Sequence, residues 1–360
     1  MKMKKQLFYL MTLTVVLLSG CSEINNPAED DNSPKEDKIL WILNEGSMGH
    51  NNSTLARYDL TAKELVKDCF LTVNKRGLGD VGNDMLQYGT KIYIVVSKSS
   101  SIEVVDATTG MSITRIDMKT TGGDAKEPRR IASYGGKVYV TSFDDTVTRI
   151  DTATLAIDGS VTVGQDPEGI AIRNNKLYVA NSGGLNWANN YDNTVSVIDV
   201  NSFREEMKME IGVNPGALQI DSQGDVYVAV SGNYTDAHPS AFKKINASDG
   251  KVTTAPGIDA PVKFVIADNK AYIINGSYGE PNSVIVYDCL NEKIITDSFI
   301  SDGTSIAIMN NITVDPFSGD VFIAETDYIN PGNLHCFDKN GRLKYSLTSV
   351  GLNPSVVVLQ

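Results

Sequence analysis

The residues best suited to ligand chemistry are aromatic and amide side chains in the stretch SGGLNWANNYDN, residues 182–193. Trp187 and Tyr191 offer large flat surfaces, and the surrounding asparagines and glycines let a ligand approach the backbone closely. Three later stretches, GNYTDAHPS, GSYGEPN and ETDYINP, also combine a tyrosine with an asparagine. Stacking and hydrogen bonding, rather than bond breaking, are the chemistry of such side chains. The predicted ligand-binding set from these four stretches is Trp187, Tyr191, Tyr234, His238, Tyr278 and Tyr328.

Two adjacent arginines, Arg129 and Arg130, are the other candidate ligand-binding residues. A guanidinium group can fork onto a phosphate or a carboxylate with two parallel hydrogen bonds. The same side chains could instead pair with Asp124 or Glu127, which lie just before them in the sequence. The sequence leaves both interpretations open.

No pattern of catalytic residues accompanies these candidates. The chain has three histidines, and it contains no GxSxG turn, HExxH helix or glycine-rich phosphate loop in the required context. We therefore expect a protein that is not an enzyme, with no catalytic residue, metal ligand or cofactor. Single carboxylates such as Asp84 and Glu168 could still bind an ion, so a metal-dependent enzyme remains an alternative.

These residues are embedded in a repeat of roughly 45 residues, the length typical of a propeller blade with four short strands. Each unit has an aromatic residue in one strand and an apolar–Asp pair, once apolar–Asn, at the end of the next. The Asp or Asn is predicted to hold a turn and the aromatic residue to fill the space between blades. The aromatic positions are Trp41, Tyr93, Tyr139, Tyr178, Tyr227, Tyr272 and Phe322. The polar positions are Asp59, Asp106, Asp151, Asp199, Asn246, Asp288 and Asp338.

Seven units predict an all-β, seven-bladed β-propeller over residues 38–360, with four antiparallel strands (a to d) in each blade. The first unit begins at its strand b, KILWILNEG, whereas the C-terminal LNPSVVVLQ follows the pattern of a strand a. We therefore expect the last strand to complete blade 1, which leaves the ring without an open edge.

The aromatic and histidine candidates fall in the connections between strands b and c, whereas Arg129 and Arg130 start the innermost strand of blade 3. The distance from the strand-b aromatic to the following polar residue is short in the third repeat, Tyr139 to Asp151, and long in the fourth, Tyr178 to Asp199. The connections between strands a and b stay nearly constant. Long, variable loops on a rigid scaffold are where binding sites concentrate. The aromatic loops therefore predict a ligand platform on one face, and the alternative is a loop that packs its own Trp187 as a plug.

Residues 1–21 have the order of a secretory signal: three lysines, a short apolar run, and LSGC. LSGC resembles the bacterial lipobox, which would make Cys21 the lipidated first residue of the mature chain. Residues 22–37 contain six acidic residues and one lysine, so we expect a flexible acidic tether that holds the propeller away from a membrane.

Charge and cysteine content narrow the choice of partners. The net charge is −12 and no basic run is present, which argues against nucleic acid. The spacing of Cys69, Cys289 and Cys336 fits neither a metal motif nor a disulfide framework. We expect three buried apolar cysteines, with a bridge between Cys289 and Cys336 as the alternative.

The opening LNEGSMGHNNSTLARYD and the repeated pattern LYVANS–VIDV resemble the YncE-like seven-bladed propellers, in particular surface lipoproteins of Bacteroidetes. One branch that the chain is similar to, the BtuG-type lipoproteins, captures cobalamin (vitamin B12) and passes it to a TonB-dependent transporter of the outer membrane. The resemblance implies a non-enzymatic capture protein, anchored by lipid in the outer membrane and facing the cell exterior, with the periplasmic side of that membrane as the alternative. The alternatives are an adhesin or scaffold that binds protein or glycan, and the metal-dependent enzyme.

Overall fold

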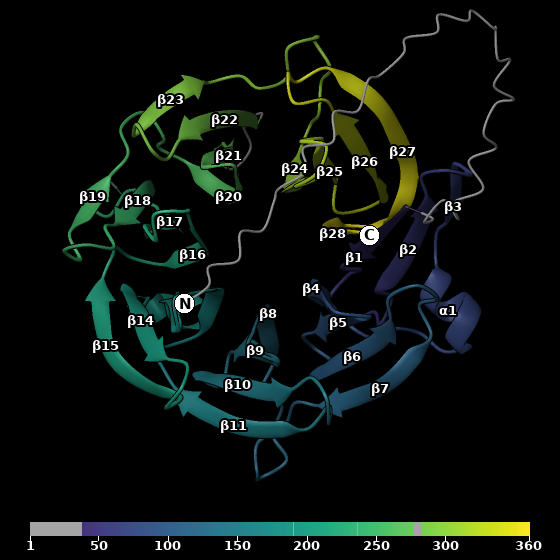
Figure 1. Cartoon of the computed structure of the whole chain (residues 1–360), viewed down its shortest axis with the longest axis horizontal. Coiled ribbons are helices and arrows are strands. Elements are labelled where there is room, and N and C mark those ends of the chain that lie inside the picture. The colour runs from purple at the N-terminus through teal and green to yellow at the C-terminus, as the bar shows by residue number, and fades with distance from the viewer. Residues whose placement is uncertain (1–37, 190, 236, 277–281) are drawn as a thin grey trace, which may run out of the picture. The chain divides into compact units, whose positions relative to one another are not determined.

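The computed structural model describes residues 38–189, 191–235, 237–276 and 282–360. This part of the chain forms seven antiparallel four-stranded sheets, which Figure 1 shows as blades around a ring, with strand a of each blade innermost. The predicted seven-bladed β-propeller is confirmed. The expected signal segment with Cys21, residues 1–21, and the expected tether, residues 22–37, lie outside the described residues.

In each blade, strand a lies at the centre of the ring and strand d at the rim. Blade 1 contains β28 (Pro354–Leu359), β1 (Ile39–Asn44), β2 (Thr54–Asp59) and β3 (Glu64–Val66). Blade 2 contains β4 (Gly82–Tyr88), β5 (Lys91–Val96), β6 (Ser101–Asp106) and β7 (Ser112–Asp117). Blade 3 contains β8 (Pro128–Tyr134), β9 (Lys137–Ser142), β10 (Thr146–Asp151) and β11 (Ile157–Thr162). Blade 4 contains β12 (Pro167–Arg173), β13 (Lys176–Asn181), β14 (Thr194–Asp199) and β15 (Arg204–Glu210).

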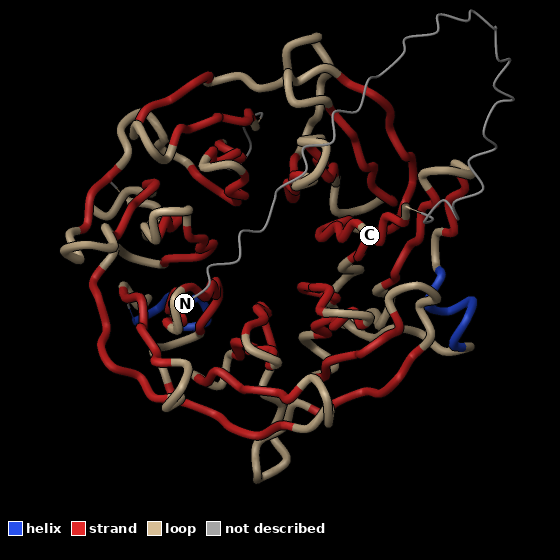
Figure 2. Tube along the Cα trace, viewed as in Figure 1, coloured by secondary structure: helices blue, strands red, loops and turns tan. Residues whose placement is uncertain are grey.

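The remaining blades follow the same order. Blade 5 contains β16 (Pro215–Ile220), β17 (Val226–Val230), β18 (Ala241–Ile245) and β19 (Val252–Thr254). Blade 6 contains β20 (Pro261–Ala267), β21 (Lys270–Asn275), β22 (Ser283–Asp288) and β23 (Lys293–Thr296). Blade 7 contains β24 (Met309–Val314), β25 (Val321–Glu325), β26 (Pro331–Phe337) and β27 (Leu343–Leu352). The helices of the described chain are short, α1 (Cys69–Asn74) and the 3₁₀ helix η1 (Gly184–Asn189), drawn in blue in Figure 2.

The apolar core is divided into seven clusters, one between each pair of neighbouring blades. The repeated strand-b aromatic residues lie in these clusters, as predicted. Trp41 and Tyr93 are fully buried, and the Trp41 indole donates a hydrogen bond to the Ala107 carbonyl of the next blade at 2.8 Å. Tyr178 is the exception, because it is only partly buried. Burial between blades, more than within them, therefore holds the ring together.

The two ends of the propeller meet in blade 1. Strand β28 pairs antiparallel with β1 in the register Leu40↔Leu359, Trp41↔Val358 and Ile42↔Val357. All residues of β1 are buried, and because their side chains alternate between the two faces of the sheet, both faces of this strand are covered. The C-terminal strand thus completes blade 1, as predicted.

The repeated Asp and Asn residues hold the turns between strands c and d. Asp59 accepts hydrogen bonds from the backbone of Thr61 and Ala62 at 2.9 and 2.8 Å, and Asn246 accepts one from Ser248 at 2.9 Å. The amide oxygen of Asn246 therefore replaces the carboxylate oxygen in blade 5. These residues are structural.

At Asp151, the contribution of the carboxylate charge to the stability of the c–d turn can be measured. Its carboxylate accepts hydrogen bonds from Lys137 Nζ at 2.6 Å and from the Thr154 backbone at 2.7 Å, and both hold its pKa below the ordinary 3.8. Because the folded pKa is lowered, the associated stability is present above about pH 4 and is lost as the pH falls through the folded value. We expect Asp151→Asn to keep the turn, as Asn246 does, but to lower the melting temperature by a few degrees at pH 7. That difference should begin to shrink as the pH is lowered below about 4 and should vanish only below the folded pKa of Asp151, and a pH-independent difference would contradict the prediction.

Cys69, Cys289 and Cys336 are buried and carry no disulfide. Cys289 lies in the cluster between blades 5 and 6, and Cys336 in the cluster between blades 7 and 1. The buried interpretation is confirmed, and the alternative bridge between these two residues is wrong. In the described chain no helix is long and apolar enough to cross a membrane.

Candidate ligand site on the long-loop face

One face of the propeller carries the long loops. The b–c connections comprise residues 45–53 in blade 1, 182–193 in blade 4 and 231–240 in blade 5, but only 97–100 and 143–145 in blades 2 and 3. Turns between strands a and b, on the opposite face, are as short as residues 89–90 and 135–136. We call the side of the b–c loops the long-loop face. The predicted asymmetry of loop length is present in blades 1, 4 and 5. Blade 7 departs from it, because its b–c connection, residues 326–330, is shorter than its a–b connection, residues 315–320.

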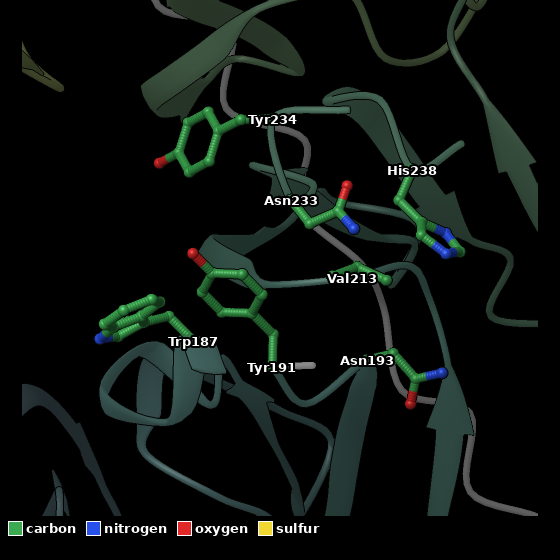
Figure 3. Close-up of a pocket in the computed structure, with 7 residues that line it drawn as sticks. All are labelled: Trp187, Tyr191, Asn193, Val213, Asn233, Tyr234 and His238. Atoms are coloured by element: carbon green, nitrogen blue, oxygen red, sulfur yellow. The ribbon is translucent and has the colours of Figure 1, made fainter. Parts of the chain in front are cut away.

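A cavity of about 680 Å³ opens between the long loops of blades 4 and 5. In Figure 3 the rings of Trp187, Tyr191 and Tyr234 lie on one side of it, and the side chains of His238 and Asn193 on the other. The lining contains four of the predicted ligand residues and three further ones: Trp187, Tyr191, Tyr234 and His238, with Asn193, Val213 and Asn233.

The blade 4 loop is anchored at both ends, so its aromatic residues are held in place. Gly183 has a φ of +60°, and a Cβ there would lie 2.1 Å from the Asp192 nitrogen, so only glycine fits this close approach. Asp192 accepts hydrogen bonds from the backbone of Gln165 and Thr194 at 3.0 and 2.9 Å. Between these anchors, η1 carries Trp187.

Asp166 fixes the start of η1 from the neighbouring d–a connection. Its carboxylate accepts a hydrogen bond from the Leu185 backbone at 2.9 Å, and its carbonyl accepts one from the Ser182 hydroxyl at 2.7 Å. Burial raises the pKa of Asp166, although the bond from Leu185 opposes that shift. Trp187 therefore lies on a loop that is hydrogen-bonded to the residue just before β12, the innermost strand of its own blade.

The blade 5 loop is closed in a similar way. Gly232 has a φ of +69°, and a Cβ there would lie 2.1 Å from the His238 carbonyl oxygen. The backbone of Asn233 donates to that oxygen at 3.1 Å, and the backbone of His238 donates to Thr235 at 3.2 Å. No hydrogen bond from the described part of the chain reaches the His238 imidazole, which faces the cavity. The loop thus presents a ring and an imidazole to the same space.

The aromatic rings face solvent rather than packing into their own loops. The exposed fraction is 71% for Trp187 and 82% for Tyr234, so the alternative in which Trp187 plugs its own loop is wrong. Tyr191, Tyr234 and Tyr328 also have positive φ angles of 32°, 62° and 62°. A bulky side chain in this region of backbone conformation is strained, but Leu155 and Phe203, in turns between strands c and d, adopt it too, so it does not by itself mark a site. The exposure of the rings, rather than their backbone angles, is what a ligand platform requires.

Two predicted residues lie away from the cavity or outside the described chain. Tyr328 lies in blade 7 on the same face and is 58% exposed, and burial together with the charge of Glu45 raises its pKa. It does not line the cavity. Tyr278 belongs to residues 277–281, outside the described residues.

Arg129 and Arg130 lie in β8 and form ion pairs around the centre of the ring. Arg129 donates to one Glu168 oxygen from Nε at 2.9 Å and from Nη2 at 2.6 Å, and Arg130 lies 3.6 Å from the other oxygen. The partner is therefore Glu168 rather than Asp124 or Glu127. Burial alone would raise the pKa of Glu168, but the charges of Arg129 and Arg130 hold it below its usual value. The pair links blades 3 and 4 and lies outside the cavity.

Two further charged side chains share this central environment. Burial raises the pKa of Asp84, although the nearby Arg130 charge opposes the shift. Burial and the same Arg130 charge lower the pKa of Lys263. Both residues follow the register shift at the start of a strand a. In the described part of the chain, no group of three or more His, Cys, Asp or Glu side chains is placed to hold a metal ion.

Three residues that line the cavity, Asn193, Val213 and Asn233, are not among the predicted ligand-binding residues. Asn193 and Asn233 lie in the stretches already singled out, and their amide composition was the available signal. Val213 lies in the connection between β15 and β16. The length of this d–a connection gave no signal, because it is short. Val213 lines the cavity only because the connection emerges on the same face as the b–c loops.

Among solved structures, similar folds share little sequence with this chain. A protein from Bacteroides uniformis provisionally named a 6-phosphogluconolactonase has a TM-score of 0.64 and 12% identity, over 90% of this chain and 100% of that chain. A similarly named protein from Bacteroides fragilis has a TM-score of 0.62 and 13% identity, over 92% and 100%. Hydrazine synthase from Kuenenia stuttgartiensis has a TM-score of 0.59 and 15% identity, over 72% and 77%. These likenesses show the propeller fold alone.

Sequence comparison places the chain in one domain family. No curated protein matches it by sequence. The family DUF5074, described as a domain of unknown function, matches residues 38–349, which include every blade strand except β28 and the end of β27. The chain therefore belongs to the DUF5074 family.

Proposed function

We propose that the protein is a binding protein whose long-loop face captures a large, flat small molecule, and that the molecule is a corrinoid such as cobalamin. The observation that carries this proposal is the convergence of Trp187, Tyr191, Tyr234 and His238 on one cavity. They come from two loops of two different blades. In each loop a glycine allows the two ends of the loop to approach each other closely. Exposed aromatic rings at a concave site are typical of ligand recognition.

The chemistry of the lining favours binding over turnover. Its rings provide flat surfaces for stacking, and the amides of Asn193 and Asn233 provide both donors and acceptors. Among the described residues that line the cavity, His238 is the one titratable side chain besides the tyrosines, and these residues include neither a carboxylate nor a serine or cysteine to act with it. The lactonase names of two structural neighbours belong to those proteins, at 12% and 13% identity.

The size of the site suits one edge of a large ligand. A cavity of about 680 Å³ is in the range that holds a drug-sized molecule. A corrinoid ring would place one edge between the loops and rest the remainder on the face. Its amide-bearing rim matches the asparagine side chains, and its flat ring matches Trp187 and Tyr234. The resemblance to BtuG-type lipoproteins supports this choice of ligand.

The proposed setting is the outer membrane. A chain lipidated at Cys21 and tethered through residues 22–37 would hold the propeller at the cell exterior. The long-loop face would then deliver its ligand to a TonB-dependent transporter. An adhesin that uses the same face against protein or glycan is the competing function.

A size-exclusion experiment tests the proposal. The full chain, purified in detergent, is mixed at micromolar concentration with cyanocobalamin and separated on a sizing column. We expect the red corrin absorbance to elute with the protein at one equivalent per chain. Colourless protein would exclude corrinoid capture and turn attention to glycan or protein ligands.

A further inference from the structure

A chain of hydrogen bonds crosses three neighbouring strands of blade 7, away from the ligand cavity of blades 4 and 5. Ser346 in β27 has its hydroxyl oxygen 2.8 Å from Nδ1 of His335 in β26. The other ring nitrogen of His335, Nε2, lies 3.1 Å from a carboxylate oxygen of Glu325 in β25. Ser346 and His335 are directly opposite each other in the strand register, so the contact is set by the backbone. A serine, a histidine and a carboxylate are thus connected in order.

Glu325 is held in its charged form by its surroundings. It accepts hydrogen bonds from the Asn333 amide at 2.6 Å and from the Ala307 backbone at 3.3 Å. Partial burial works against the charge, but the bonds from Asn333 and His335 outweigh it and hold the pKa of Glu325 below its usual value. An ionised carboxylate can only accept hydrogen bonds.

The charge of Glu325 fixes the direction of the whole chain. Because the carboxylate accepts, the hydrogen of a neutral His335 must lie on Nε2 and point at Glu325. Nδ1 then carries a lone pair, so the Ser346 hydroxyl donates its hydrogen to Nδ1. This is the arrangement in which an imidazole withdraws the proton of a serine as the oxygen attacks an electrophile.

Ser346 and His335 differ in solvent exposure, as a serine nucleophile and its general base require. Ser346 is an exposed residue, whereas only 9% of His335 is exposed, so the base is shielded while the serine lies at the surface. Strand β27 is the outermost of its sheet and has no partner strand on its outer edge. Backbone N–H groups of such an edge are available donors for a developing oxyanion.

We propose that Ser346 is an activated nucleophile that accepts an acyl group from a carboxylic ester at the side of blade 7. The Ser346 oxygen attacks the ester carbonyl while His335 takes the hydroxyl proton. Collapse of the tetrahedral adduct forms the Ser346 acyl ester and breaks the bond to the leaving alcohol, which receives the proton from His335. Oxidation states do not change and no co-reactant is needed. Glu325 acts as a positioning residue that orients the imidazole.

A fluorophosphonate probe, which esterifies activated serines with loss of fluoride, tests the proposal on the full chain. We expect one label per chain, found on the peptide that contains Ser346 by mass spectrometry. Ser346→Ala should abolish that label. His335→Gln should slow labelling at least tenfold, and Glu325→Gln should slow it while Ser346 remains in place. In the same way, p-nitrophenyl acetate should release nitrophenolate in a burst that Ser346→Ala removes.

Thr348→Ala provides the matched control, because Thr348 is an exposed hydroxyl two residues along the same strand. It should label at the wild-type rate. Melting temperatures close to that of the wild type show that each variant is folded, so that a slower rate reports reactivity. Absence of label in the wild-type protein, or equal rates in wild type and His335→Gln, would overturn the proposal and leave the three residues as a structural link between strands. Cyanocobalamin binding is measured separately and does not depend on this result.

Discussion

Deletion of residues 354–360 is expected to leave the protein without a cooperative fold. The deletion removes β28 and with it the strand that pairs with β1 and closes the ring. Val357 belongs to the cluster between blades 7 and 1, and Val356 and Val358 pack on the cluster between blades 1 and 2. Each well-buried Val or Leu contributes about 1.5–3 kcal/mol. Loss of the strand therefore costs about 5 kcal/mol or more, which is comparable to the whole stability of many domains.

The deletion also exposes an edge that has no polar protection. Strand β1 is buried along its full length, so its free edge would present apolar side chains and unpaired backbone groups to other chains. Circular dichroism should show no sharp thermal transition, and size exclusion should show aggregates. A synthetic peptide of residues 353–360 added in trans should restore part of the transition. A truncated chain that melts sharply within about 2 °C of the wild type would show that another strand closes the ring.

The fold was predictable because each of the seven repeats has to form the same four-stranded blade. A single strand such as β15 is ambiguous, since REEMKME has a helix-like composition. The neighbouring blades resolve it, because a unit with an aromatic strand b and an Asp-ended strand c needs a fourth strand in that place. Closure by β28 was predictable for the same reason: blade 1 lacked a strand a and the C-terminal segment had no strand b after it.

The candidate site was predictable only in part, because the loop sequences differ from blade to blade and one loop therefore says nothing about the conformation of another. Composition selected Trp187 and Tyr234, and the geometry that brings them together depends on the close approaches at Gly183 and Gly232. The partner of Arg129 was not predictable from its sequence neighbours. Glu168 lies one blade away and reaches the arginine because both residues begin an innermost strand. The contact between Ser346 and His335 could not be predicted from the sequence for a related reason, since strand register, rather than spacing along the chain, sets it.

The double substitution Trp187→Ala with Tyr234→Asn is expected to weaken cyanocobalamin binding by at least 100-fold. Both rings are largely exposed and line the same cavity from two blades. Removal of an aromatic residue at the centre of a binding site commonly costs about 2 kcal/mol, and about 1.4 kcal/mol corresponds to a tenfold change in Kd. Asparagine is chosen at position 234 because it tolerates the positive φ of 62° and so preserves the loop while removing the ring. Isothermal titration calorimetry of wild type and variant gives the ratio directly.

Phe317→Ala is the matched control, because Phe317 is 93% exposed in the turn between β24 and β25 on the opposite face. Its loss removes a comparable ring from the surface without touching the long loops, so affinity should stay unchanged. Both variants should melt within about 2 °C of the wild type, since exposed side chains contribute little to folding. Equal losses in both variants would indicate nonspecific stacking of the corrin on surface aromatics. Unchanged binding in the double variant would place the corrinoid elsewhere on the propeller. A loss confined to the double variant can arise only if the ligand is held between the loops of blades 4 and 5.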